Sequence, residues 1–249
     1  MRLSIPISLF FIFLLFTLSA FAVYEPFSSN STPTFNATGT ISGTVTFSGK
    51  VPKLGKIKMD ADPGCLNKHK EAVYSQALVM GKNNTMANIF VRVTTGLPKK
   101  DYAPPKEPVV LDQHGCMYSP HVFGVMAGQP LKILNSDGIL HNIHPLPKVN
   151  RKFNLAMPKT ITETEKVFKK VEEDKFTIKC DVHPWMNAYA AVMSHPYYDV
   201  TEKDGKFTIS GLDAGSYEIE AWHEKLGTLT EKVTVKAGAT AKADFTFKK

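Results

Sequence analysis

Alternation of apolar and polar residues is the dominant pattern along the chain. Residues 41–47 (ISGTVTF) alternate in this way, and residues 87–95 (ANIFVRVTT) repeat the pattern. Four further stretches near the C-terminus, KFTISGL, SYEIEAWH, LTEKVTV and AKADFTF, are separated by turn residues. Because successive side chains of a strand point to opposite faces, this period of two predicts β-strands. Short strands at close spacing favour β-sandwiches, so we predict an all-β fold.

The length of 249 residues allows one large or two small domains with buried cores. The Pro-rich residues 97–108 (LPKKDYAPPKEP) predict a connector. Residues 163–173 (ETEKVFKKVEE) are the one stretch whose pattern would also suit a helix. We predict strand and turn there instead.

Residues 1–22 have the organisation of a secretory signal peptide. Arg2 precedes the apolar run ISLFFIFLLFTL, and the small residues Ala20 and Ala22 follow it. This order predicts cleavage after Ala22 and a periplasmic or secreted mature protein, with an uncleaved N-terminal anchor as the alternative. Residues 23–40 are rich in Ser, Thr, Asn and Pro, which predicts a flexible linker. No later apolar run is long enough to span a membrane, so we expect no membrane span in the mature chain.

The C-terminal part carries a sandwich-like motif. Residues 204–219 have the pattern D-G-x-F-x-I-x-x-L-x-A-G-x-Y-x-I, and the initial Asp-Gly pair predicts a hairpin turn. The motif resembles the second half of a carboxypeptidase regulatory-like domain, a small transthyretin-like sandwich. The resemblance implies early strands elsewhere in the chain, and residues 43–45 (GTV) and 87–91 (ANIFV) fit them.

These patterns predict three structured segments after the linker, which together form two Greek-key-type β-sandwiches. Residues 41–107 supply N-terminal strands, residues 108–194 form a second domain, and residues 195–249 form the later half of the regulatory-like sandwich. Two arrangements stay open at this point. The middle domain is inserted into a sandwich built from both ends of the chain, or the two domains follow one another in sequence.

A cysteine, a histidine and a methionine stand three residues apart in the stretch KCDVHPWM. Alternation through DKFTIKC places Cys180 on the inward face at a strand end, and the following loop brings His183 and Met186 toward it. Upstream, alternation in LHNIHP turns His141 inward with its apolar neighbours and His144 outward. The candidate metal ligands are therefore His141, Cys180, His183 and Met186.

Two motifs in this region resemble those of the cupredoxins, most closely the plastocyanin and amicyanin branch. They are N-x-x-x-x-x-H-N at residues 135–142 and C-x-x-H-x-x-M at residues 180–186. The resemblance implies a cupredoxin-like copper domain at residues 108–194. It also implies that the cysteine and the two histidines are equatorial ligands of one type 1 copper ion, with the methionine as the weak axial ligand. Asn142 would tie the histidine loop to the cysteine strand.

The ligand types favour copper by themselves. Thiolate and thioether suit Cu(I), and imidazole suits Cu(II) as well, so such a set can serve both oxidation states. Zinc fits less well, because thioether is a poor zinc ligand and the sequence has no second cysteine pair. The set leaves no open position for a substrate, so we expect no enzymatic activity. A buried inert thiol beside ordinary loop residues is the remaining interpretation.

The other two cysteines, Cys65 and Cys116, lie in the turn-like contexts DPGC and HGC. In an oxidising compartment we predict a disulfide between them, which leaves Cys180 as the free thiol. The competing interpretation is a second metal site. Its candidate ligands are Cys65, His69, His114, Cys116 and His121.

The leading hypothesis is an exported type 1 (blue) copper protein that carries single electrons between redox partners. The formal charge of +7 falls to +6 without residues 1–22, which favours a partner with an acidic docking surface and, in the absence of a recognition motif, no nucleic acid. His183 is expected to reach the surface beside Trp185 and form the docking edge. The alternative is a non-redox structural or surface- or carbohydrate-binding module whose metal site serves storage or stability.

Overall fold

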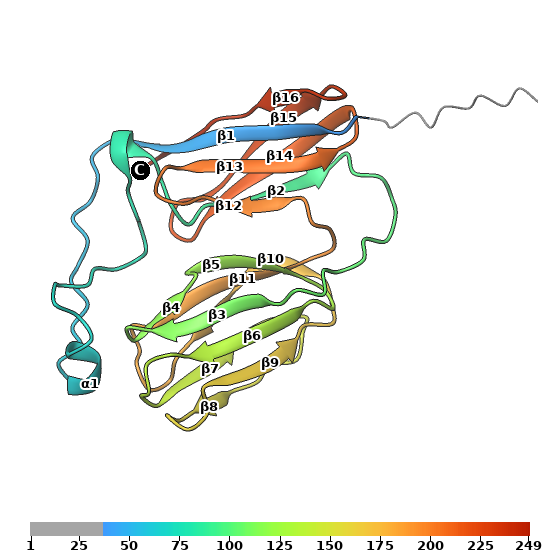
Figure 1. The fold of residues 1–249 in the computed structure, drawn as a ribbon. Helices are drawn as coiled ribbons and strands as arrows, with labels where there is room; N and C mark the ends of the chain where they lie inside the picture. Colours follow the sequence, from blue (N-terminus) through green and yellow to red (C-terminus); the bar gives the residue numbers. More distant parts are fainter. Residues whose placement is uncertain (1–36) are drawn as a thin grey trace, which may run out of the picture. The chain divides into compact units, whose positions relative to one another are not determined.

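The computed structural model describes residues 37–249, so the predicted signal peptide and most of the predicted linker lie outside the described residues. In this range the fold is all-β, as predicted, with only the short α1 (Pro63–Leu66) and the 3-10 turn η1 (Lys82–Asn84) as helical elements (Figure 1). The first strand begins at Gly39, inside the predicted linker. None of the described helices is long and apolar enough to cross a membrane.

Strands from both ends of the described chain form one sandwich, which we call the terminal sandwich. One sheet has β1 (Gly39–Ser48) paired with β13 (Lys206–Leu212), β16 (Thr240–Lys242) and β17 (Phe245–Lys248). The other sheet has the order β12 (Tyr198–Val200), β2 (Phe90–Thr95), β14 (Gly215–His223) and β15 (Gly227–Val235). Because β1 and β2 find their partners among the C-terminal strands, neither end of the chain completes this sandwich alone.

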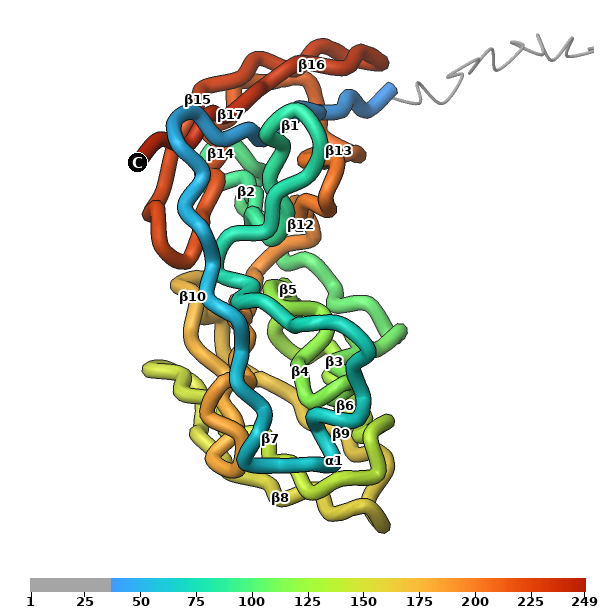
Figure 2. Tube along the Cα trace, turned by 90° about the vertical axis from the view of Figure 1, so that its left-hand side faces the viewer, coloured from blue at the N-terminus to red at the C-terminus, as the bar shows by residue number. Residues whose placement is uncertain are grey.

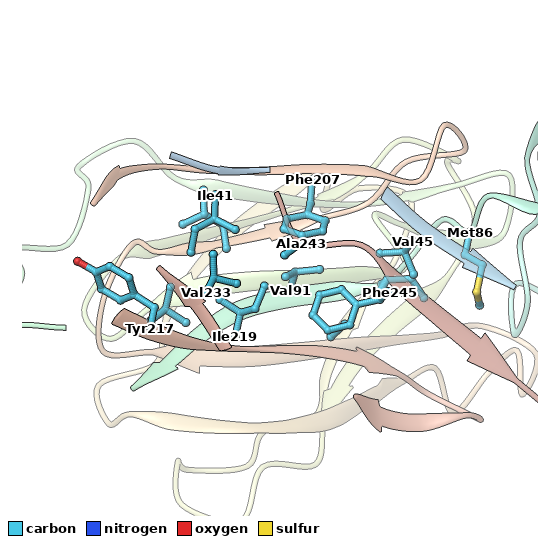
Figure 3. Packing of buried hydrophobic residues seen from close by; sticks show 14 of the residues in the cluster. Ile41, Val45, Met86, Val91, Phe207, Tyr217, Ile219, Val233, Ala243 and Phe245 are labelled. Carbon is cyan, nitrogen blue, oxygen red and sulfur yellow. The ribbon is translucent and has the colours of Figure 1, made fainter. Parts of the chain in front are cut away.

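Alternation explains the core of the terminal sandwich. Ile41 and Val45 on β1 face Phe207, Ile219 and Val233 from the other strands, and all five side chains are buried. Figure 3 shows these side chains pointing toward one another between the two sheets. The intervening residues of each strand are more exposed, as a two-residue period requires.

The remaining strands form the central sandwich, which is inserted between β2 and β12. One sheet has the order β5 (Val122–Met126), β11 (Asn187–Met193), β10 (Glu172–Lys179), β7 (His141–Pro145) and β8 (Leu155–Met157). The other has β4 (Met117–Ser119), β3 (Val109–His114), β6 (Pro130–Asn135) and β9 (Glu163–Val167). Residues 163–173 are strand and turn, as predicted, because they form β9 and lead into β10.

The connection between β1 and β2 joins two strands of the terminal sandwich and packs against the central sandwich. Figure 2 traces it from β1 to α1 and back toward β2. A bridge between Lys56 and Tyr74 closes its distal part, residues 56–74, which we call the cover segment. Met59 and Cys65 are the buried residues of the cover segment, and both belong to the core of the central sandwich. The segment predicted to hold only strands of a regulatory-like sandwich therefore also covers the second domain.

Ile219 tests the core of the terminal sandwich, because it is fully buried on β14 between β2 and β15. We expect Ile219→Ala to lower the free energy of unfolding by about 2–5 kcal/mol, through lost burial and a residual cavity. The matched control is Thr230→Ala on the exposed face of β15, which should change stability by no more than about 0.5 kcal/mol. Urea unfolding followed by circular dichroism measures both. Equal losses in the two variants would contradict this core assignment.

Candidate metal centre

The loop after β10 gathers three of the four predicted ligands. Alternation in β10 buries Phe176 and Ile178, and Cys180 follows on the same inward face. The backbone N–H of Cys180 donates to the carbonyl of Met186 at 3.2 Å, and that of Met186 donates to the carbonyl of His183 at 2.9 Å. These two bonds close the loop over a few residues. The N–H of His183 also donates to Sγ of Cys180 at 3.3 Å, so the loop backbone solvates the sulfur.

His141, at the start of β7, is delivered by the preceding loop. The Nδ2 group of Asn135 donates to the carbonyl of Ile139 at 2.8 Å, which fixes that loop from within. Oδ1 of Asn142 accepts a hydrogen bond from the backbone N–H of Asp181 at 2.6 Å. This contact joins the histidine strand to the residue after the cysteine, which confirms the role expected for Asn142.

Three donor atoms converge in the core of the central sandwich. One ligand atom each of His141, Cys180 and His183 lies within 4.8 Å of the others, and all three residues are buried. Nδ1 of His141 is 2.9 Å from Nδ1 of His183, and the latter is 3.9 Å from Sγ of Cys180. Met186 is fully buried in the same hydrophobic cluster. The structure therefore gathers the residue types that the sequence suggested for copper.

A carboxylate holds the far side of each imidazole. Nε2 of His141 is 2.9 Å from Oδ2 of Asp137, and Nε2 of His183 is 3.0 Å from Oδ2 of Asp62. Since a carboxylate accepts, each neutral ring carries its proton on Nε2 and presents a lone pair on Nδ1. Two lone pairs that face each other at 2.9 Å repel, and either a proton between the two nitrogens or a metal ion beside both of them removes the repulsion. The donor set thus fits a bound metal ion.

Hydrogen bonds favour the charged forms of two buried acids in the centre. Burial raises the pKa of the Cys180 thiol, but the bond with His141 and the N–H groups of Asn142 and His183 lower this pKa below its usual value overall. Burial likewise opposes ionisation of Asp137, yet His141 and two backbone N–H groups bring its pKa to about 2. Both pKa shifts favour the negatively charged forms of Cys180 and Asp137, which attract a cation. The thiolate is also the form of cysteine that binds metal.

The structure confirms the disulfide between Cys65 and Cys116, and Cys180 is the free, buried cysteine. This pairing removes two donors from the competing second metal site. Two of its three candidate histidines also have other partners. His69 contacts a backbone carbonyl at 2.7 Å, and His121 contacts the carboxylate of Glu224 at 2.6 Å.

The prediction that His183 reaches the surface is wrong. Its exposed fraction is 2%, the same as that of the cysteine ligand candidate. Asp62 covers its Nε2, and Sγ of Cys65 lies 3.5 Å from the same atom. Trp185 packs inward, with its ring centroid 5.0 Å from that of His183 and its N–H donating to the carbonyl of Cys116 at 3.1 Å. The sequence of the loop after β10 predicted an exposed imidazole edge. Asp62 and Cys65, from the connection between β1 and β2, cover that edge.

Sequence reasoning missed both carboxylates. Asp62 precedes proline in DPGC and caps α1, accepting from the N–H of Gly64 at 2.8 Å, which is a local signal that the sequence does contain. No local signal shows that its other oxygen reaches a histidine 121 residues further along. His144, expected to point outward, pairs with Asp181 at 2.8 Å and takes no part in the three-residue group.

Comparison with protein families gives one partial match. A family model described as polysaccharide lyase family 4, domain II, matches residues 174–243. This stretch begins in β10 of the central sandwich and ends just after β16 of the terminal sandwich, and it is less than half of the chain. No curated protein sequence matches the chain. The resemblance to a carboxypeptidase regulatory-like domain stays a prediction.

Solved structures of cupredoxins resemble part of the chain. A copper-containing nitrite reductase from Thermus scotoductus SA-01 is 18% identical over 41% of this chain and 25% of its own length, with a TM-score of 0.32. A methionine variant of amicyanin with Cu(I) is 18% identical over 41% of this chain and 98% of its own, with a TM-score of 0.30. A purple cupredoxin from Nitrosopumilus maritimus is 26% identical over 31% of this chain and 82% of its own, with a TM-score of 0.26. This chain thus spans about a quarter of the nitrite reductase.

A thiol count tests the state of the three cysteines. After unfolding in guanidinium without a reductant, and with metal removed by a chelator, we expect one reactive thiol per chain, that of Cys180. The same sample treated with a reductant should give three. Three thiols before reduction would contradict the disulfide and revive the second metal site.

Proposed function

We propose that this chain is a type 1 copper protein that carries single electrons between redox partners. The proposal rests on one observation. The free thiol of Cys180 and the imidazoles of His141 and His183 place their ligand atoms within 4.8 Å of one another, and all three residues are buried. Met186 would be the weak axial ligand, as in the motif that the sequence resembles. Bound copper would supply a one-electron change between Cu(I) and Cu(II), which this mixed donor set suits.

The protein's own contribution is a rigid and dry pocket. Carboxylates fix both rings, the loop bonds fix the cysteine, and the hydrophobic cluster around Cys180 and Met186 excludes water. Such outer contacts tune a metal centre through orientation and polarity. With three strong donors and a thioether, the pocket has no evident position for a substrate, so we propose a carrier and not an enzyme.

The setting that we propose is periplasmic or secreted, with the partner docking through an acidic surface. The disulfide between Cys65 and Cys116 supports an oxidising compartment. The excess of positive charge supports an acidic partner, because complementary charge speeds encounter.

A second candidate function draws support from the covered histidine. Because the ring of His183 is only 2% exposed, it offers little edge for contact with a partner. This favours a metal centre that serves stability or storage in a structural or surface-binding module. A carrier bleaches reversibly on reduction and exchanges electrons with a protein partner, whereas a module of this kind does not complete that cycle.

Cys180→Ser tests the proposed centre. Loading the unaltered protein with Cu(II) should give a strong blue absorption band, because the thiolate transfers charge to copper. The serine variant should lose the band, since its oxygen cannot replace the thiolate. His144→Ala is the matched control and should keep the band, because His144 pairs with Asp181 outside the three-residue group. A band that survives in the serine variant would refute the assignment.

Trp185 tests the path toward a partner. The indole lies against the ring of His183 and is half-buried, so it presents the partly exposed aromatic surface beside this ring. We expect Trp185→Ala to slow electron transfer from a protein donor several-fold in stopped-flow mixing, with the blue band unchanged. The rate for the unaltered protein should fall as salt rises, because screening weakens attraction to an acidic partner. An unchanged rate, or a damaged band, would show that Trp185 serves only the fold.

A further inference from the structure

The cover segment reaches the metal centre at three points. Asp62 accepts from Nε2 of His183, and Cys65 forms the disulfide with Cys116. Nζ of Lys68 donates to the backbone carbonyl of Asp137 at 2.7 Å and lies 3.5 Å from the carboxylate of that residue. All three contacts come from one short stretch that is far in sequence from the histidines and the free cysteine.

The disulfide lies between the two carboxylates that hold the imidazoles. The N–H of Cys65 donates to Oδ1 of Asp62 at 3.3 Å, and the N–H of Cys116 donates to Oδ2 of Asp137 at 2.7 Å. Each half-cystine thus anchors one carboxylate through its own backbone. The covalent bond therefore links the backbone groups that hold Asp62 and Asp137, the two carboxylates that contact the rings.

Besides the disulfide, the cover segment is held by Ile57 and Val73, which pack on the core of the central sandwich, and by a hydrogen bond of 2.7 Å between Nε2 of His69 and the carbonyl of Gly115. Met59 and Cys65 are its buried residues, and α1 within it is only four residues long. The side chain of Asp62 is 32% exposed, and an isolated contact of this kind at a surface contributes little by itself. The disulfide is the covalent link that holds this stretch, and with it Asp62, beside the ring of His183.

We propose that Asp62 is a positioning residue of the metal centre, held over His183 by the disulfide-anchored cover segment. This inference rests on the proposed function, because it assigns Nδ1 of His183 to the metal. Asp62 keeps the ring proton on Nε2, which leaves the Nδ1 lone pair free and aimed at His141 and Cys180. The same contact shields the outer edge of the ring from solvent.

The test uses Asp62→Ala, with Asp60→Ala as the matched control, since Asp60 is an exposed aspartate of the same segment. Nitrogen-15 NMR of the metal-free full-length mature protein, at a pH where the rings are neutral, reports which nitrogen of His183 carries the proton. We expect one tautomer with hydrogen on Nε2 in the unaltered protein and in Asp60→Ala. Asp62→Ala should give a mixture of the two tautomers.

Copper affinity supplies the second readout. Competition with a Cu(I) chelator should show Asp62→Ala binding about 10- to 100-fold more weakly, the usual effect of removing a carboxylate behind a histidine ligand. Asp60→Ala should bind as the unaltered protein does. The double variant Cys65→Ala/Cys116→Ala should reproduce the tautomer mixture, because it releases the cover segment. Asp62→Ala retains the disulfide, and its circular dichroism and its single free thiol check that it folds.

The outcomes separate this inference from the proposed function. If Asp62→Ala keeps one tautomer and the copper affinity of the control, the positioning role is refuted while the copper centre stands. If the unaltered protein shows the single tautomer, and Asp62→Ala the mixture, but neither gives a blue copper form, the positioning of His183 stands and the electron-carrier proposal fails.

Discussion

Two imidazole nitrogens that face each other across 2.9 Å set the main constraint on the central sandwich. With carboxylates behind both rings, the facing atoms of the neutral rings both carry lone pairs, and a metal ion beside them, or a proton between them, makes the arrangement favourable. The nearby thiol has a lowered pKa, so a third negative or lone-pair donor joins them. The loops, the carboxylates and the cover segment together hold these donors in a buried position. An apolar core of ordinary composition would need none of these contacts.

The centre draws on three separate stretches of the chain, and the topology explains how they meet. The histidine strand β7 and the cysteine strand β10 are neighbours in one sheet, so their adjacent ends bring His141 and Cys180 together. The third stretch, around Asp62, comes from the connection between β1 and β2. Because the terminal sandwich needs strands from both ends of the chain, that connection leaves one sandwich, covers the other and returns. The connection between β1 and β2 thus supplies Asp62 to the candidate metal centre, in addition to the residues that the central sandwich supplies.

The sequence predicted the parts of the centre that depend on local geometry. Alternation placed His141 and Cys180 inward, and the short loop brought His183 near them, because these facts depend on a few consecutive residues. An odd number of cysteines suggested the disulfide. The contact between Asp62 and His183 could not be predicted, because strand patterns identify strands but not their partners. For the same reason the sequence left the inserted and sequential arrangements open, and it placed His183 at the surface wrongly.

The cover segment also closes one edge of the His183 ring. Nε2 of His183 is occupied by Asp62, so the ring contacts the outside chiefly through the half-buried indole of Trp185. That indole donates to the carbonyl of Cys116, and the same residue is disulfide-bonded to Cys65 in the cover segment. One covalent bond therefore positions both the residue that closes the imidazole edge and the aromatic ring beside it. Coverage of the imidazole edge and placement of the indole beside it thus both involve the same disulfide-linked pair of residues.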